Sequence, residues 1–360
     1  MRMLTTIRLA LRAGIAAALL AGCGGPQPPI GAPGGTLQDQ TSWVRPDRGE
    51  SWMESSASKT LLYVDDDTSN DTYVFDYPSG KLVGKLTGFY DPKGMCVDQK
   101  GDVYISNSQY GLLTEYAHGG TKPINIYQDP GTSLIGCSIS AKGDVAAYGR
   151  ADRRGSNVCI WKGGNSDKSP KCIYASKSTL GSAFGLSTCA YDHDGDLVGL
   201  GGYNGILIPF MILAGKTTME KLTLSGIKLK ILGNFTGAEN TSWDGKYITL
   251  GLYQPRRGGD QTVLQPVKLI GTTLTAIGSL ILLPVNCNKA VIGSPFFFGA
   301  HNVTAASTTR ATRVTGPPLN CGKSAEGVVD EWSYPETGKK PILRIPVAHD
   351  TGGDAVSIAE

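Results

Sequence analysis

Acidic side chains in short runs are the residues of this chain best suited to hold a cation. The run Asp192–Asp196 places carboxylates at alternate positions, as calcium-binding loops do. Such a loop would need Glu at its twelfth position, which is Tyr203, so we interpret the run as a hairpin turn around Gly195. The denser run Asp65–Asp67, with Asp71 after it, we interpret as a solvated loop.

Histidine is the usual general base, and this chain has four of them. His118, His193, His301 and His349 all stand beside Gly, Asp or Asn in turn-like sequence. Their spacing does not predict a catalytic triad, and the sequence has neither a Gly-x-Ser-x-Gly nucleophile elbow nor a phosphate-binding glycine loop. We therefore expect surface histidines, and the sequence favours a binding protein over an enzyme.

The first 22 residues have the pattern of an export signal. Three arginines precede an apolar stretch over 13–21, which is much shorter than the ~20 residues that a membrane span needs. The segment ends in Leu20-Ala-Gly-Cys23, which resembles the lipobox of bacterial lipoproteins. The resemblance implies cleavage before Cys23 and lipidation of that residue. It implies a protein that is lipid-anchored in the bacterial cell envelope, outside the cytoplasm.

Composition separates the rest of the chain into two parts. Residues 23–55 are rich in Gly and Pro and are expected to form a tether, followed by one domain over 56–360. The three arginines of residues 1–22 account for the net charge of +3, because the other 31 Lys and Arg equal the 31 Asp and Glu in number. We therefore expect no nucleic-acid partner, since the processed chain has no overall basic field.

Cysteines other than Cys23 number seven, so at least one of them must be a free thiol. The strongest predicted disulfide is Cys159–Cys172, because each residue lies in a short strand and the segment between them reads as a hairpin loop. A weaker prediction pairs Cys287 with Cys321. The three others occupy similar positions in predicted inner strands, where we expect them to be small buried hydrophobic residues: Cys96, Cys137 and Cys189.

A repeated phrase indicates the architecture that positions these residues. It consists of a short strand, a turn that contains Gly, and a second short strand. It recurs at intervals of roughly 41 to 52 residues, which is the period of β-propeller blades. The first strand and the turn of each copy occupy Gly94–Gly101, Gly136–Gly143, Thr188–Gly195 and Asn240–Gly245.

Extending this pattern predicts six blades. The strands that follow the inner strands begin at Leu61, Val103, Val145, Leu197, Tyr247 and near Val303. The last segment, Asp354–Ala359, would supply the inner strand of the first blade. The sequence therefore predicts an all-β fold, a six-bladed β-propeller with four-stranded blades, closed by pairing of the N- and C-terminal strands.

The second predicted blade resembles an NHL repeat. The resemblance rests on Asp91–Asp98, Gly101–Asn107 and Leu113–Tyr116, and in weaker form it covers roughly residues 61–200. It implies a six-bladed propeller but no single function, because such propellers bind proteins, RNA or sugars.

A related six-bladed fold, the calcium-dependent lactonase of the SMP-30 type, provides an alternative function. Its metal would sit at the mouth of the central channel, which the starts of the inner strands line. The residues available there are Asp91, Glu239, Asn240 and Asp354. Calcium is the only cofactor that either function would involve.

Arginines follow three of the predicted second strands. Because the loops after these strands all leave a propeller on one face, the arginines are expected to form a surface for an anionic glycan or a protein, with Tyr110, Tyr203 and Tyr253 nearby. The alternative is three unrelated solvated loops. The arginines are Arg150, Arg153, Arg154, Arg256, Arg257, Arg310 and Arg313.

Overall fold

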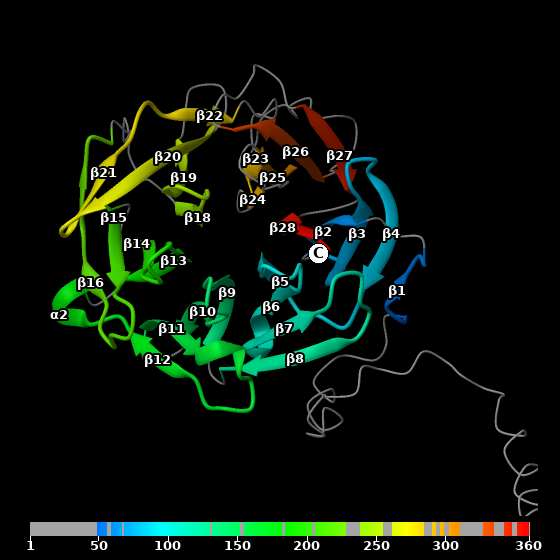
Figure 1. Cartoon of the computed structure of the whole chain (residues 1–360), viewed down its shortest axis with the longest axis horizontal. Coiled ribbons are helices and arrows are strands. Elements are labelled where there is room, and N and C mark those ends of the chain that lie inside the picture. The colour runs from blue at the N-terminus through cyan, green and yellow to red at the C-terminus, as the bar shows by residue number, and fades with distance from the viewer. Residues whose placement is uncertain are drawn as a thin grey trace, which may run out of the picture. The chain divides into compact units, whose positions relative to one another are not determined.

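The structure is a computed structural model of the chain. It describes residues 49–55, 59–66, 68–129, 132–151, 155–181, 184–203, 206–227, 238–254, 261–283, 290–292, 296–298, 302–309, 327–334, 342–347 and 351–359. The described strands form six sheets, which are arranged around a common centre (Figure 1). Within this described part, no helix combines the length and the apolar character needed to cross a membrane.

Three sheets contain the first half of the chain. The first has the order β1 (Trp52–Met53), β4 (Lys81–Leu86), β3 (Asp71–Asp76), β2 (Thr60–Asp66) and β28 (Thr351–Ile358). The second has the order β5 (Pro92–Val97), β6 (Val103–Asn107), β7 (Leu112–Tyr116) and β8 (Pro123–Gln128). The third has the order β9 (Thr132–Ile139), β10 (Val145–Ala151), β11 (Gly155–Trp161) and β12 (Lys171–Tyr174).

Three further sheets follow. The fourth has the order β13 (Gly185–Tyr191), β14 (Leu197–Tyr203), β15 (Ile206–Ile212) and β16 (Glu220–Lys221). The fifth has the order β18 (Ala238–Trp243), β19 (Ile248–Gln254), β20 (Gln261–Ile270), β21 (Thr273–Ala276) and β17 (Thr223–Ser225), with β22 (Ile281–Leu283) also on β20. The sixth has the order β23 (Ala290–Ile292), β25 (Asn302–Thr309), β26 (Gly327–Ser333) and β27 (Leu343–Val347), with β24 (Phe296–Phe298) also on β25.

Among the described residues, three short helical turns lie between the strands. They are the 3-10 turns η2 (Ser108–Tyr110) and η3 (Lys162–Gly164) and the single-turn helix α2 (Lys177–Leu180). The described strand pairs are all antiparallel except β17 with β21. The six sheets are the blades of a β-propeller, as the repeat predicted.

The inner strands of successive blades contact one another around the ring. The neighbours are β28 and β5, β5 and β9, β9 and β13, β13 and β18, β18 and β24, and β24 and β28. Two glycines permit the close approach at β5. A Cβ atom on Gly94 would lie 2.7 Å from the carbonyl oxygen of Ile135, and one on Gly353 would lie 2.8 Å from that of Lys93.

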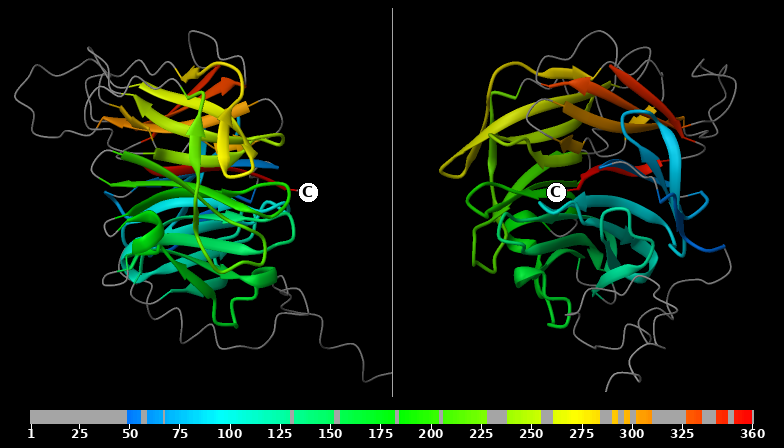
Figure 2. Two further views of the ribbon diagram at one scale, coloured as in Figure 1. Left: turned by 90° about the vertical axis from the view of Figure 1, so that its left-hand side faces the viewer. Right: turned by 45° about the vertical axis from the view of Figure 1, so that its right-hand side comes forward.

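The first blade is built from segments far apart in the sequence. Leu61 on β2 lies opposite Ser357 on β28, in an antiparallel pair. The first described strand, β1, takes no part in this pairing and lies at the outer edge against β4. The inner strand of this blade is therefore the last described strand of the chain, and its partner is the second (Figure 2).

The repeated phrase forms the turn between the first two strands of a blade. In the second blade the Asp98 carboxylate accepts the backbone N–H groups of Lys100 and Asp102. Ser140, Asp192 and Asp244 cap the equivalent turns in the same way. The glycine of each turn has φ between +77° and +93°, which glycine adopts at little cost. The interpretation of Asp192–Asp196 as a hairpin turn is confirmed.

Apolar side chains fill the spaces between adjacent blades. One cluster combines Leu61 and Tyr63 of the first blade with Val103 and Ile105 of the second. Similar clusters join the second blade to the third, the third to the fourth, the fourth to the fifth, and the first to the sixth. Alternate residues of each buried strand therefore face different neighbouring blades, since side chains alternate along a strand.

Candidate functional site

The predicted calcium ligands come from three inner strands or the loops before them. Asp91 precedes β5, and its Oδ1 lies 3.2 Å from the Nζ of Lys93. Asp354 lies on β28 and is 1% exposed. Glu239 and Asn240 lie on β18, but their side chains are outside the described residues. The four-residue calcium site therefore stays a prediction.

The acidic run at the end of β2 differs from the expected solvated loop. Asp65 and Asp66 are both buried, as is Asp71 at the start of β3, because the strand pairing continues to Asp66–Asp71. Thr72 Oγ1 donates to Asp65 Oδ1 at 2.7 Å. The Asp71 carboxylate pairs with Lys85 Nζ at 3.2 Å. These buried carboxylates therefore have partners within their own blade, and Asp67 lies outside the described residues.

A second acidic group lies in the second blade, beside the turn between β5 and β6. Asp98, Asp102 and Glu115 bring their carboxylates within 4.8 Å of one another. Burial, reinforced by the charges of Asp98 and Glu115, raises the pKa of Asp102. Glu115 accepts hydrogen bonds from Asn125 and Tyr127, each at 2.8 Å. The oxygens of Asp98 and Glu115 thus already hold the turn and two outer side chains in place.

One predicted arginine lies on the described surface. Arg150 is exposed at the end of β10, opposite Ser133 on β9. The six others fall outside the described residues: Arg153, Arg154, Arg256, Arg257, Arg310 and Arg313. Their gathering on one face therefore stays a prediction.

An aromatic pair, of which Tyr90 is exposed and Tyr110 is half-buried, lies at the same end of the blades as Arg150. The rings of Tyr90 and Tyr110 have centroids 5.8 Å apart, and Tyr90 is 38% exposed. Ser108, next to this pair in the turn after β6, has its Oγ 3.1 Å from that of Ser133. Sequence reasoning named Tyr110 but missed Tyr90, although an aromatic residue just before an inner strand is a readable signal.

The histidine expectation holds for one of the two described residues. His193 is exposed and stacks on Trp243 with ring centroids 6.4 Å apart. His118 is half-buried, and its Nδ1 lies 2.6 Å from Ser357 Oγ. Ser357 is fully buried and donates to the carbonyl of Gly101, so this pair fastens a turn of the second blade to β28. His301 and His349 lie outside the described residues.

The cysteine prediction is confirmed for one pair and wrong for another. Cys159 on β11 and Cys172 on β12 lie directly opposite and form a disulfide. Cys96 and Cys137, expected to be free, form a second disulfide between β5 and β9, because the inner strands of neighbouring blades approach closely. Cys189 is a buried free thiol whose pKa burial raises. The pair Cys287–Cys321 lies outside the described residues.

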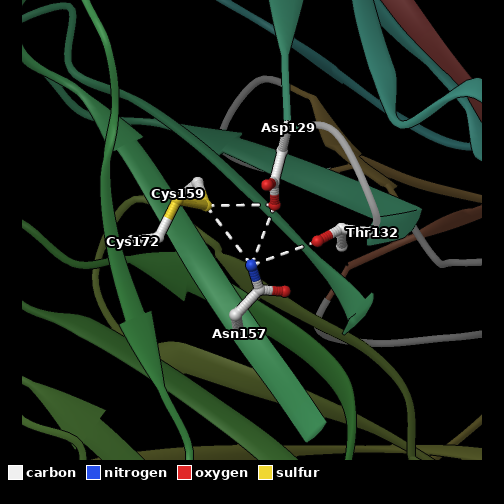
Figure 3. Close-up of a disulfide and its surroundings, with 5 residues drawn as sticks. All are labelled: Asp129, Thr132, Asn157, Cys159 and Cys172. Carbon is white, nitrogen blue, oxygen red and sulfur yellow. Dashed lines mark hydrogen bonds between the residues drawn. A yellow bond between two sulfur atoms is a disulfide. The ribbon is translucent and has the colours of Figure 1, made fainter. Parts of the chain in front are cut away.

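Polar side chains surround the Cys159–Cys172 disulfide (Figure 3). Asp129 Oδ2 lies 3.1 Å from Cys159 Sγ. The Asn157 amide donates to Asp129 Oδ2 at 2.8 Å and lies 3.3 Å from Cys159 Sγ and from Thr132 Oγ1. Asp129 and Asn157 are both buried. The sequence analysis predicted neither residue. Asn157 could have been noticed, because it stands two residues before Cys159 in the same strand.

No protein-family model matches this chain, and a search of curated proteins found no relative. Among solved structures, a chain of a nidogen–laminin complex has a TM-score of 0.55 at 11% identity, over 84% of this chain and 99% of that chain. A protein of unknown function from Bacteroides caccae has a TM-score of 0.52 at 9% identity, over 83% and 99%. TolB from Acinetobacter baumannii has a TM-score of 0.49 at 14% identity, over 89% and 69%.

The fold is a β-propeller. The two likenesses with TM-scores of 0.55 and 0.52 support this architecture, and at such identities they show nothing about ligand or activity. In this β-propeller, the candidate ligand-binding surface among the described residues consists of Arg150 and the Tyr90–Tyr110 pair at one end of the blades. The buried polar group around Cys159 lies between the second and third blades.

Proposed function

We propose that this β-propeller is a binding module of the bacterial cell envelope, held at a membrane by lipid on Cys23 and located outside the cytoplasm. The observation that carries the proposal is the pair of disulfides, Cys96–Cys137 and Cys159–Cys172. Disulfides persist in oxidising compartments and are rare in the cytosol. They agree with the export signal and the lipobox-like segment that precedes the domain.

The proposed ligand is an anionic glycan or an acidic protein surface. It would bind at the end of the blades that carries Arg150 and the Tyr90–Tyr110 pair. An exposed guanidinium can form paired hydrogen bonds with a carboxylate, and the exposed ring of Tyr90 offers stacking area to a sugar. The other predicted arginines would enlarge this surface, which we call the arginine end.

Lipidation is tested with the whole chain expressed in a bacterium. Cys23→Ala should abolish incorporation of a labelled fatty acid and release the protein from the membrane fraction. Cys189→Ala, which alters a buried cysteine instead, should leave both readouts at the parent level. A Cys23→Ala protein that still incorporates the label would contradict the anchor.

Ligand binding is tested with charged and neutral polysaccharides. Arg150→Gln combined with Arg256→Gln and Arg257→Gln should weaken binding of an acidic polysaccharide, and binding by the parent should fall as salt is added. The matched control is Lys100→Gln with Lys142→Gln and Lys246→Gln, which also removes three positive charges, because these exposed lysines lie in the turns at the opposite end of the blades. Equal losses in both variants would count against the arginine end. Repeating the assay with calcium and with a chelator tests the predicted calcium site.

A further inference from the structure

We propose that the end of the blades opposite the arginine end rests on an anionic bilayer, so that the protein meets the membrane with its folded surface as well as with its lipid. This end carries the turns between the first and second strands of the blades and the connections between the third and fourth strands. The inference rests on the proposed membrane attachment, because a shallow surface contact is useful to a protein already held near a bilayer.

The strand register brings both sets of loops to one end of the molecule. In the second blade Val103 pairs with Val97 on one side and with Tyr116 on the other, and Tyr116 pairs with Pro123. The turn from β5 to β6 therefore lies at the same end as the connection from β7 to β8. The third and fourth blades have the same arrangement. Arg150 is near the other end of β10, so the two ends are opposite.

Exposed lysines surround this end, which we call the lysine end. They come from each of the first five blades, so they are spread around the ring. Anionic headgroups attract lysines at a membrane surface. A flat bilayer can meet many of these side chains at once, whereas a small anion or a single polymer chain can touch only a few. The exposed lysines are Lys59, Lys81, Lys100, Lys122, Lys142, Lys162, Lys168, Lys171, Lys216 and Lys246.

Most carboxylates at the lysine end lie deeper than these lysines. Asp98, Asp192 and Asp244 are half-buried, and each accepts backbone N–H groups of its own turn. Among the described residues there, the exposed carboxylates are those of Asp167 and Asp194. The outermost charge at this end is therefore mainly positive.

Two of the lysines also have partners within the protein. Lys81 Nζ lies 2.7 Å from Glu54 Oε2, and Lys162 Nζ lies 2.7 Å from Asp144 Oδ2. Both lysine side chains remain 63% exposed, so each ammonium group can still donate to a headgroup. The tests below use other lysines of this end, which lie in the turns between first and second strands.

Large apolar side chains are exposed among the lysines. Ile358 is 48% exposed where the inner strand β28 ends, and Leu82 and Ile124 are 40% and 41% exposed near the starts of two outer strands. Ile270 and Ile342 are exposed at the same end of the fifth and sixth blades. Apolar side chains that enter the headgroup layer add their burial to the attraction of the charges. This combination suits a bilayer surface.

The anchor permits this orientation. The described domain begins at Gly49, whose carbonyl accepts a hydrogen bond from Thr87, just beyond the end of β4. A chain as long as residues 23–48 can span at most ~90 Å. An eight-residue strand such as β9 is only about 26 Å long. Lipid on Cys23 can therefore reach a bilayer that the lysine end faces, and the arginine end then points away from the membrane.

The first test is sedimentation of the full-length Cys23→Ala chain with vesicles, so that no lipid on the protein contributes. Vesicles of equal parts phosphatidylglycerol and phosphatidylcholine should bind this chain, and the binding should fall as salt is added. Vesicles of phosphatidylcholine alone should bind it much more weakly. Equal binding to the two kinds of vesicle would overturn the proposal. It would leave the anchor standing if the parent still incorporates the labelled fatty acid, so the two proposals fail separately.

Two variants of that chain, each with three positive charges removed, show which end makes the contact. Lys100→Gln with Lys142→Gln and Lys246→Gln should weaken binding to the anionic vesicles by about 100-fold, since each lysine near an anionic surface contributes about fivefold in affinity. Arg150→Gln with Arg256→Gln and Arg257→Gln should bind these vesicles as tightly as the unsubstituted chain. Equal losses, or a larger loss in the arginine variant, would show that the lysine end is not the contact.

A second test uses the lipidated parent protein, so it does not depend on the folding of any variant. The protein is reconstituted in each kind of vesicle, and its lysines are labelled with an amine reagent and read by peptide mass spectrometry. Lys100, Lys142 and Lys246 should react more slowly on anionic vesicles than on neutral ones. Lys177, exposed in α2 at the arginine end, should react equally on both.

Two results of the labelling would contradict the proposal. Protection of Lys177 in place of the three turn lysines would mean that the arginine end faces the bilayer. Protection of the turn lysines by soluble glycerol phosphate, as strong as that by anionic vesicles, would mean that they bind small anions and not a membrane surface.

Discussion

Cys96 and Cys137 lie in different blades and are joined by a disulfide, with Cα atoms 5.7 Å apart. Cys96 lies on β5 and Cys137 on β9, so the bond ties two neighbouring inner strands beside the centre of the ring. Both residues belong to one apolar cluster with Tyr104 and Leu134. The bond therefore fixes the lateral spacing of two blades as well as closing a loop.

The first prediction concerns the relative worth of the two disulfides. Cys96→Ser with Cys137→Ser opens a loop with a sequence separation of 41, whereas the Cys159–Cys172 separation is 13. The chain-entropy relation gives about 4 kcal/mol for the longer loop and about 3 kcal/mol for the shorter one. Denaturant unfolding of the two double variants should show the larger loss for Cys96/Cys137. The reverse order would contradict the prediction.

The second prediction concerns alkaline pH. Burial raises the pKa of Tyr63 from its ordinary value of 10.0 to about 12. The neutral phenol is therefore favoured in the folded state, and its contribution is complete below pH 10 and is lost as pH rises through 12. Two units correspond to about 3 kcal/mol. Urea unfolding at pH 9 and pH 11 should show a smaller alkaline loss in Tyr63→Phe than in the parent, and equal losses would contradict this.

The third prediction concerns glycine on an inner strand. Gly94→Ala would place a Cβ 2.7 Å from the carbonyl oxygen of Ile135, so β5 and β9 would have to separate. We expect a loss of about 1–3 kcal/mol, as for overpacked cores. Gly185→Ala is the matched control, because a Cβ there would be 3.5 Å or more from its neighbours. The measurement is the thermal midpoint of each variant, and similar midpoints would be the contrary result.

The fourth prediction concerns a contact between the fifth and sixth blades. The Tyr334 hydroxyl donates to the Asp244 carboxylate at 2.5 Å, and lies 3.2 Å from Thr249 Oγ1. Tyr334→Phe removes a hydrogen bond to a charged group and should cost about 1.5–3 kcal/mol of unfolding free energy. Tyr116→Phe removes a buried hydroxyl for which the described structure records no such bond, and should cost less. A larger loss in Tyr116→Phe would refute the role of this contact.

Most of the fold could be predicted from the repeated phrase. It predicted the strand that begins at Val103 and its partners because a short hairpin turn needs Gly at positive φ and a polar cap such as Asp98. Local spacing also predicted Cys159–Cys172, since one hairpin brings these residues together. Cys96–Cys137 could not be read in this way, because the distance between two blades is not encoded in the pattern of either strand.

The remaining errors share a physical cause. Acidic composition indicates exposure, so Asp65 and Asp66 read as a loop, yet the pairing of β2 with β3 carries both into the interior. No sequence pattern indicated the contact of Asp129 with Cys159, because Asp129 lies in the loop between β8 and β9 whereas Cys159 lies on β11. Contacts between sheets depend on the assembled ring, and a single sequence shows mainly what happens within each hairpin.

The pairing of β2 with β28 has a consequence for how the ring is made. During synthesis β2 emerges before the strands of the five other blades, and its eventual inner neighbour emerges after all of them. Until then β2 presents an unpaired edge, the kind of surface on which other chains can add. The growing chain must therefore be shielded or kept extended, and final docking of one strand converts an open, aggregation-prone arc into a stable ring.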